Sequence, residues 1–336
     1  MEGRRRVTGA DALDRARGRS PRGAAGRVVA IFTANEPLPI LGSEELLDSP
    51  PPCISTVRAW AARAGATVPR AASRVQRFRL PSFEGFEYQD SVALMSRAML
   101  APDSPALWGV GTAEASLPAA SPRVLHLQDD RPGLFTELLP VFGVRFSAYT
   151  PADYSALKHR TGTIVEKDSA FELLLVEHPD ARPRLSLAKP RCVPDLAAAL
   201  DLLGNASFRT GARAAVECGD LTLASVGDAP LEGVVRVEQD VPESLIVQVD
   251  PSEDAVLLIN DAWQPGWTAL LDGAPTHLLP ANALVRAVPT PRGTHRVELR
   301  YHAPGLMPGV WLCAATCLGL AVTELLRRRR SPRKTG

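Results

Sequence analysis

The chain has 336 residues, of which 45% are hydrophobic and 22% charged, and it carries a net charge of +1. This length allows two or three domains, and the composition is that of a folded protein with an apolar core. The near-neutral charge, without a basic stripe interleaved with aromatic residues, excludes a protein that recognises nucleic acid over a large surface.

Residues 1–27 contain eight arginines scattered among glycine, alanine and aspartate. Such a segment buries too little apolar surface to fold, and we expect a disordered basic tail. The apolar stretch at 28–34 is short for a secretory signal and has no small-residue cleavage pattern after it. We therefore interpret it as a buried strand.

Residues 28–208 mix helical and strand patterns and are predicted to form a small α/β layer. Asp129 and Asp130 follow a predicted strand, and paired carboxylates at a strand end suit a cation held beside a phosphate. The alternative interpretation is a solvated loop. We expect helices at 44–47, 55–64, 133–139 and 194–203, and strands at 122–127, 144–149 and 171–176.

Residues 209–304 have a different pattern, with short apolar runs recurring between glycine, proline, aspartate and asparagine. Several runs alternate apolar and polar residues, as strands with one solvated face do, so we predict an antiparallel β-sandwich. The expected strands are 214–218, 221–226, 233–239, 244–249, 255–260, 268–271, 284–288 and 295–301.

The segment 263–282 carries the clearest turn chemistry in the chain. Pro265-Gly266 suits a turn with proline second and glycine third, and Asp272-Gly273 suits a tight hairpin that needs positive φ. Four of its residues are candidate ligand contacts, and for each a structural role is the alternative. Trp263 and Trp267 are suited to stack on a sugar ring or to fill a core, and Asp272 and Asn282 to bind a polar ligand or to form turns.

Residues 305–327 hold no charge until Glu324 and are followed by an arginine block at 327–330. About 20 apolar residues span the hydrocarbon core as a helix, so we predict one transmembrane helix. The alternative is a helix buried in a soluble core. The arginines place residues 328–336 in the cytoplasm as a basic tail, and the domain before the helix outside.

A domain outside the membrane must be carried across it by some segment before the C-terminal helix. Nothing in 1–304 is suited to carry so large a domain across a membrane, so we expect earlier transmembrane helices and interpret the chain as the C-terminal piece of a polytopic protein. A tail anchor with the domain inside is the alternative. Cys192 and Cys218 are interpreted as two buried free thiols, and a disulfide in an oxidising compartment is the other possibility.

The ordered motif from 263 to 304 resembles the C-terminal end of YfhO-type bacterial membrane proteins, which are similar to GT-C-fold glycosyltransferases that use polyprenyl-phosphate sugars. Two further stretches, 138–146 and 181–184, resemble other parts of that family. The matching residues are Trp263, Pro265, Gly266, Trp267, Ala269, Asp272, Gly273, Pro275, Ala281, Asn282, Arg286, Val288, Pro291, Gly293, His295, Val297, Tyr301 and Pro304.

The resemblance implies an extracytoplasmic domain of the bacterial cell envelope that contacts a polytopic glycosyltransferase core or a polyprenyl-linked glycan. Its expected role is accessory or substrate-positioning, because the family's catalytic acidic loops are absent from this chain. The alternative is a tail-anchored β-sandwich binding protein without enzymatic chemistry. No convergent acid, base or nucleophile is visible, so we assign no catalytic residue, metal ligand or cofactor, and the enzyme question stays open.

Overall fold

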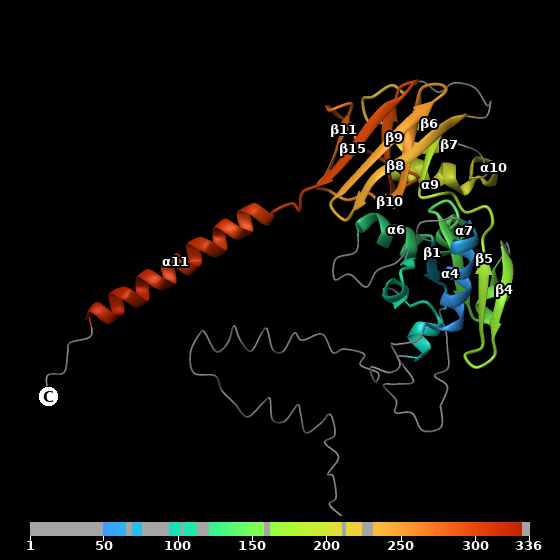
Figure 1. The fold of residues 1–336 in the computed structure, drawn as a ribbon, viewed down its shortest axis with the longest axis horizontal. Helices are drawn as coiled ribbons and strands as arrows, with labels where there is room; N and C mark the ends of the chain where they lie inside the picture. Colours follow the sequence, from blue (N-terminus) through green and yellow to red (C-terminus); the bar gives the residue numbers. More distant parts are fainter. Residues whose placement is uncertain are drawn as a thin grey trace, which may run out of the picture. The chain divides into compact units, whose positions relative to one another are not determined.

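The computed structural model describes residues 50–64, 69–75, 94–101, 104–112, 121–157, 162–209, 213–223 and 231–330. The chain divides into two compact units, and the second, Pro51–Arg79 with Arg97–Gly336, contains the helices and strands given below (Figure 1). The predicted basic tail and the elements predicted at 28–34 and 44–47 lie outside the described residues.

Sheet A is a five-stranded mixed sheet in the order β2-β1-β3-β5-β4. β1 pairs in parallel with β2 and β3, whereas β5 runs antiparallel to both β3 and β4. The predicted helix at 55–64 is confirmed as α4 (Pro52–Ala64), which buries Ile54 and Val57 in the core of this sheet. The strands are β1 (Arg70–Ser73), β2 (Gly111–Thr112), β3 (Val144–Tyr149), β4 (Thr163–Asp168) and β5 (Leu173–Glu177).

The strand predicted at 122–127 is wrong, because this segment forms the helix α6. Val124 and Leu127, three residues apart, face the core, while Leu125 between them is exposed. That spacing is the helical period, and Pro122 starts the first turn, where its missing N–H costs nothing. The helices around the sheets are η1 (Ser104–Trp108), α6 (Pro122–Asp130), α7 (Pro132–Leu138), α8 (Pro151–Ala156), α9 (Leu196–Gly204) and α10 (Ala206–Arg209).

Sheet B closes into a barrel in the order β10-β14-β13-β7-β6. β6 and β7 pair in parallel, and the other neighbouring strands pair antiparallel. Its strand β6 lies before residue 208, so the boundary predicted at 208/209 falls within this sheet. The strands are β6 (Leu185–Val193), β7 (Arg213–Glu217), β10 (Ala255–Ala262), β13 (Leu279–Ala281) and β14 (Val285–Thr290).

Sheet C is antiparallel in the order β12-β11-β15-β9-β8, and its strands lie side by side in Figure 1. It packs on one face of sheet B. β10 shows this most clearly, since Val256 and Leu258 enter the barrel core while Leu257 and Ile259 enter the core shared with sheet C. The strands are β8 (Gly233–Val241), β9 (Ser244–Pro251), β11 (Trp267–Leu271), β12 (Ala274–Thr276) and β15 (His295–Tyr301).

The predicted α+β class is confirmed, with a small α/β part, several β-sheets and one long C-terminal helix. Two sheets do pack face to face, as predicted for a sandwich, but one of them is the closed barrel with its parallel β6–β7 pair. Alternation within single strands shows which face is buried, but it does not show that the ends of a sheet meet.

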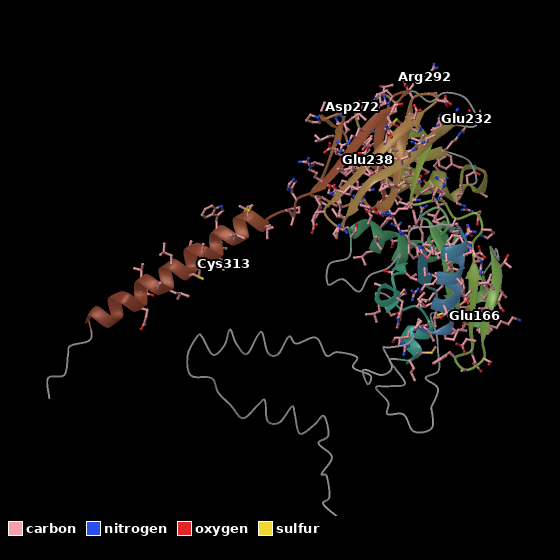
Figure 2. The ribbon with its side chains drawn as sticks, in the orientation of Figure 1. Glu166, Glu232, Glu238, Asp272, Arg292 and Cys313 are labelled. Carbon is pink, nitrogen blue, oxygen red and sulfur yellow. A yellow bond between two sulfur atoms is a disulfide. The ribbon has the colours of Figure 1, made fainter. Side chains whose placement is uncertain are left out.

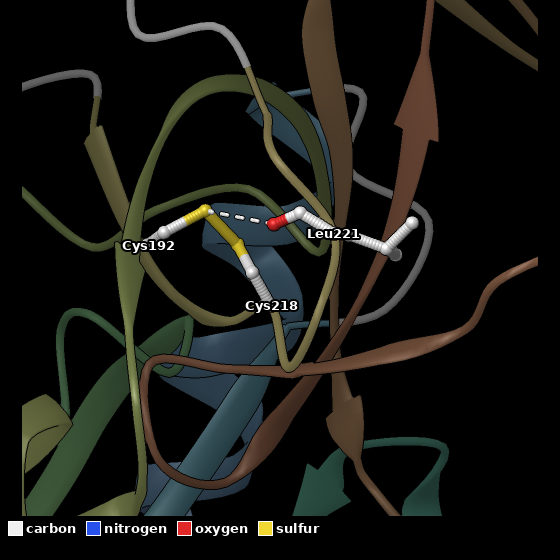
Figure 3. The surroundings of a disulfide bond; sticks show 3 residues. All are labelled: Cys192, Cys218 and Leu221. Carbon is white, nitrogen blue, oxygen red and sulfur yellow. Dashed lines mark hydrogen bonds between the residues drawn. A yellow bond between two sulfur atoms is a disulfide. The ribbon is translucent and has the colours of Figure 1, made fainter.

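The interpretation of Cys192 and Cys218 as free thiols is wrong, because the two form a disulfide (Figure 3). The parallel pairing of β6 with β7 sets Cys192 opposite Val216, and Cys218 follows two residues later, with the two Cα atoms 5.4 Å apart. The cysteines are 26 positions apart in the sequence with two helices between them, so spacing alone could not show this pairing.

The C-terminal helix α11 (Leu306–Arg330) is long and apolar enough to cross a membrane. Its window Leu306–Glu324 has a mean hydropathy of 1.7, and none of it is buried. Figure 2 shows side chains, Cys313 among them, projecting outward from this helix. The alternative of a helix buried in a soluble core is therefore wrong.

Candidate functional site

Trp263 and Trp267 lie at opposite ends of the Pro265-Gly266 turn, and both are half-buried. The Trp267 ring is 5.4 Å from that of Tyr301, and the Arg286 guanidinium lies 4.2 Å from its centre. The Arg123 guanidinium lies 5.1 Å from the centre of the Trp263 ring. Each indole therefore already packs against a side chain of the protein, as a structural role requires.

The Pro265-Gly266 turn packs against the end of β15. Gly266 has φ 102°, and a Cβ on it would overlap the carbonyl of His302 and the ring of Tyr301. The His302 backbone N–H donates to the Gly266 carbonyl at 2.8 Å. The predicted turn is confirmed, and it fastens the chain just before α11.

Asp272 occupies the β11–β12 turn, where it and Gly273 have φ 51° and 83° (Figure 2). Two positive φ values are what a tight hairpin turn of this kind needs. Its carboxylate accepts from the Arg296 backbone N–H at 2.8 Å and lies 2.7 Å from His295 Nδ1. The hydrogen bond to Asp272 raises the pKa of His295, and the Arg296 N–H, followed by His295, lowers that of Asp272.

Asn282 is fully buried in the turn between β13 and β14, with φ 43°. Its side-chain Oδ1 accepts from the Ala215 backbone N–H at 3.0 Å, and its own N–H donates to the Ala215 carbonyl at 2.7 Å. The side chain and backbone of Asn282 thus form the same two hydrogen bonds with β7 that a neighbouring strand would form. No ligand can reach it without opening the barrel.

Asp129 and Asp130 lie at the C-terminal end of α6 and not after a strand. Asp130 is exposed and lies 2.5 Å from His126 Nδ1, one helical turn earlier. The side chain of Asp129 lies outside the described part of the chain. The predicted site residues do not come together. Asp130 lies on α6, Trp263 follows β10, Trp267 and Asp272 lie at the two ends of β11, and Asn282 is buried in the barrel.

A group of charged side chains that was not predicted surrounds Asp261. Arg184 donates to this carboxylate through Nε at 3.0 Å and Nη2 at 2.9 Å, and Arg286 Nη2 lies 3.1 Å from it. Arg70 adds a third ion pair from β1. We refer to Asp261, Arg70, Arg184 and Arg286 as the Asp261 cluster.

A strand irregularity presents Asp261 to these partners. The pairing of β10 with β14 shifts register between Ile259 and Ala262, which frees the two polar residues Asn260 and Asp261 from the regular ladder. Such bulges turn side chains out of their expected alternation, often at functional sites. A polar Asn-Asp pair directly after a run of buried apolar residues is the sequence signal that could have indicated this site.

The electrostatics of the cluster follow from burial and from the three cations. Burial alone raises the pKa of Asp261, but hydrogen bonds from Arg184 and the charges of all three arginines outweigh it and hold that pKa below its ordinary value. Burial lowers the pKa of Arg286 to about 10, although Asp261 opposes this shift. The pKa of Arg184 is raised, because its hydrogen bonds to Asp261, supported by Asp240, outweigh the opposing effect of burial.

Next to the cluster lies a half-open pocket of about 180 Å³, which we call the Arg70 pocket. Arg70, Asn260 and Asp261 form its polar wall, together with Thr112. Strands of sheets A and B and the α6–α7 segment therefore all contribute to it. Its remaining walls are mostly apolar and consist of Val124, Phe135, Leu139, Phe142, Ala262, Leu284 and Val285.

One other arrangement, His178 beside Ser147, resembles part of a catalytic site but does not form one. His178 Nε2 lies 3.1 Å from Ser147 Oγ, but both residues are at most 1% exposed, and burial lowers the pKa of His178 to about 4. A neutral histidine without access to solvent cannot serve a substrate. Among the described residues, no group of three or more His, Cys, Asp and Glu side chains is placed to hold a metal ion.

The chain matches no protein-family model, no curated protein and no solved structure. Its function must therefore be argued from its own residues.

Proposed function

We propose that this chain is a single-pass, membrane-anchored extracytoplasmic domain with an accessory, substrate-positioning role beside a YfhO-like glycosyltransferase. The observation that carries the proposal is α11, whose apolar window Leu306–Glu324 is entirely unburied. A solvent-exposed apolar surface of this length is stable only in lipid or against a partner. The arginines that end the helix favour a cytoplasmic C-terminus.

The disulfide supports the extracytoplasmic side. Disulfides persist in oxidising compartments and are rare in the cytosol, where thiols are kept reduced. The Cys192–Cys218 bond belongs to sheet B, the central sheet of the domain. The disulfide and the arginine block after the helix are two independent indications that the domain lies outside and the C-terminus in the cytoplasm.

The glycosyltransferase association is supported by the ordered motif from Trp263 to Pro304. The residues at its two ends form one structural unit, since the Pro265-Gly266 turn, Trp267 and Tyr301 contact one another at the entry to α11. A motif that fixes the junction of domain and helix suits a protein whose domain works at the membrane surface. The Arg70 pocket, in contrast, favours a second candidate, a tail-anchored binding protein without a glycosyltransferase partner.

Paired cysteine labels test the topology. Glu243 is exposed in the β8–β9 turn, whereas the free native cysteines are buried (Cys53) or lie on α11 (Cys313 and Cys317). In intact cells, a membrane-impermeant maleimide should label Glu243→Cys but not Ser331→Cys. The protein without an added cysteine gives the background. Labelling of Glu243→Cys only after permeabilisation would contradict the proposal and support the tail-anchored candidate.

A crosslinking experiment tests the association. Thr268 is exposed on β11, within the motif, and a photoreactive amino acid there should capture a polytopic glycosyltransferase in membranes. The same group at Ser252, exposed on the β9–β10 turn, is the matched control. Capture of no such enzyme from Thr268, in a strain where the labels confirm the topology, would remove the glycosyltransferase part of the proposal alone.

A further inference from the structure

The Asp261 cluster holds more positive charge than its carboxylates neutralise. Arg70, Arg184 and Arg286 converge on Asp261, and Arg184 also pairs with Asp240. Three guanidinium groups thus face two carboxylates, which leaves one positive charge in excess. Excess charge beside a pocket with mostly apolar walls attracts an anion more strongly than the same charge on an open surface, because such walls lower the local dielectric.

The hydrogen bonds of the cluster are incomplete in the same way. Arg70 has five N–H groups and uses three of them, on the carbonyls of Phe142 and Asn260 and on Asp261. Arg286 Nη1, a donor of the cluster, is buried without a partner among the described residues. Buried polar atoms are almost always satisfied in folded proteins, so an unpartnered donor here indicates a missing acceptor. Asn260, only 2% exposed, also lines the Arg70 pocket.

The rest of the pocket excludes a highly charged ligand. Phe135, Leu139 and Phe142 from the α7 segment and Leu284 and Val285 from sheet B provide only apolar surface. A ligand that fits must therefore place a single negative charge at the polar wall and hydrocarbon against the remaining walls. One excess charge suits a monoanion, and the planar guanidinium of Arg70 suits a carboxylate.

We propose that the Arg70 pocket binds a small monocarboxylate with an apolar body. The carboxylate accepts from the remaining N–H groups of Arg70, and the hydrocarbon lies between Leu139, Phe142 and Leu284. The site does not depend on which side of the membrane the domain occupies. Maleimide labelling therefore tests the proposed topology, and calorimetry tests this site separately.

Titration calorimetry of the full chain in lipid nanodiscs, with empty nanodiscs subtracted, tests the site. The probes are hexanoate and its neutral match hexanamide. Because a hydrogen bond to a charged group is worth about 1.5–3 kcal/mol, hexanoate should bind at least about tenfold more tightly than hexanamide. Equal binding of the two, or no binding of hexanoate, would overturn the proposal.

Two variants locate the binding. Arg70→Gln should weaken hexanoate at least about tenfold and leave hexanamide unchanged. Because Arg70 also stabilises the cluster, Ala262→Trp provides an independent test: Ala262 is exposed at the pocket, so an indole there fills it without disturbing the core. This variant should abolish binding, and Arg296→Gln on the solvent face of sheet C should not change it. Full binding by Ala262→Trp would overturn the proposal.

Discussion

Asp272 and Asp261 lie eleven positions apart in the sequence, and both accept hydrogen bonds from basic residues, but they belong to different kinds of structure. The partners of Asp272 come from the same antiparallel segment, 23 and 24 positions away, and its side chain is 52% exposed. Asp261 is 16% exposed. Its partner Arg286 is 25 positions away, but Arg184, just before β6, lies 77 positions back and Arg70, on β1, 191 positions back.

The difference shows that one aspartate serves a local turn, whereas the other holds together segments that are far apart in the sequence. Asp272 completes a hairpin that its own neighbours already specify, so its carboxylate adds little to the fold. Asp261 neutralises three cations at a poorly solvated position, two of which come from distant segments, and each partner depends on the others. Substitutions at the two aspartates should therefore have very different effects.

The largest effect is expected for Asp261→Ala. Removing the carboxylate leaves three arginines around a buried vacancy, and breaking a buried ion pair costs about 3–5 kcal/mol of unfolding free energy. The exposed Asp272→Asn, which keeps a residue that tolerates the positive φ of this turn, should cost below about 1 kcal/mol. Urea unfolding followed by tryptophan fluorescence measures both. Similar losses at the two aspartates would break the distinction between them.

The disulfide is a second long-range link, and its removal should rank next. A loop of 26 positions closed by the bond is worth about 2–4 kcal/mol, through fewer unfolded conformations. Cys192→Ala with Cys218→Ala should lose this amount in the same unfolding assay. Cys313→Ala, on α11, is the matched control and should change the domain's stability little. An unchanged midpoint for the double variant would mean that the bond does not form in the folded protein.

Substitution of Asn282 tests whether a residue in a turn can contribute as much to stability as the disulfide or the ion pairs of Asp261. Asn282→Gly keeps a backbone that tolerates φ 43° but loses the bond to the Ala215 N–H, which should cost about 1–3 kcal/mol. Asn282→Ala adds left-handed strain of about 1 kcal/mol. Equal stability of the two variants would show that backbone strain is irrelevant at this turn.

The smallest effect is the pH dependence of the Asp272–His295 pair. The raised pKa of His295 adds stability that is complete below its ordinary value of 6.5 and is lost as the pH rises through the folded value. The lowered pKa of Asp272 adds stability above its ordinary 3.8, lost as the pH falls through the folded value. The pair should therefore contribute most between these two ordinary values.

Asp272→Asn measures this contribution, because asparagine tolerates the same positive φ. Because the carboxylate is about half exposed, solvent screening keeps the difference from the unsubstituted protein below about 1 kcal/mol. That difference should be larger at about pH 5 than at about pH 8.5. A difference that grows toward alkaline pH would have the wrong sign for this pair.

The sequence predicted the local parts of this fold well. Pro265-Gly266 and Asp272-Gly273 sit in the turns expected of them, and strands such as β8, β9 and β15 lie where the alternation placed them. Each of these depends on the preferences of adjacent residues. In 122–127 the apolar spacing was too short to separate a helix from a strand, and the interpretation as a strand was wrong.

The site itself could not be read from the sequence. Arg184 and Arg286 belong to stretches that resemble the YfhO type, but nothing in those stretches predicts that they meet. Only the closure of sheet B and the packing of β1 beside it bring them and Arg70 to Asp261. The same holds for Cys192 and Cys218, which meet through a parallel strand pair. The polar Asn260-Asp261 after an apolar strand marked one wall of the pocket, but not the partners that complete it.

The most direct test of the account is whether α11 resides in lipid. Membranes containing the full chain are extracted with alkaline carbonate, beside the variant Leu312→Arg with Leu318→Arg. The unsubstituted chain should stay with the membranes, and the variant should be released, since each arginine at a helix centre costs about 2.5–3.5 kcal/mol. Release of the unsubstituted chain, monodisperse in buffer without detergent, would contradict the account.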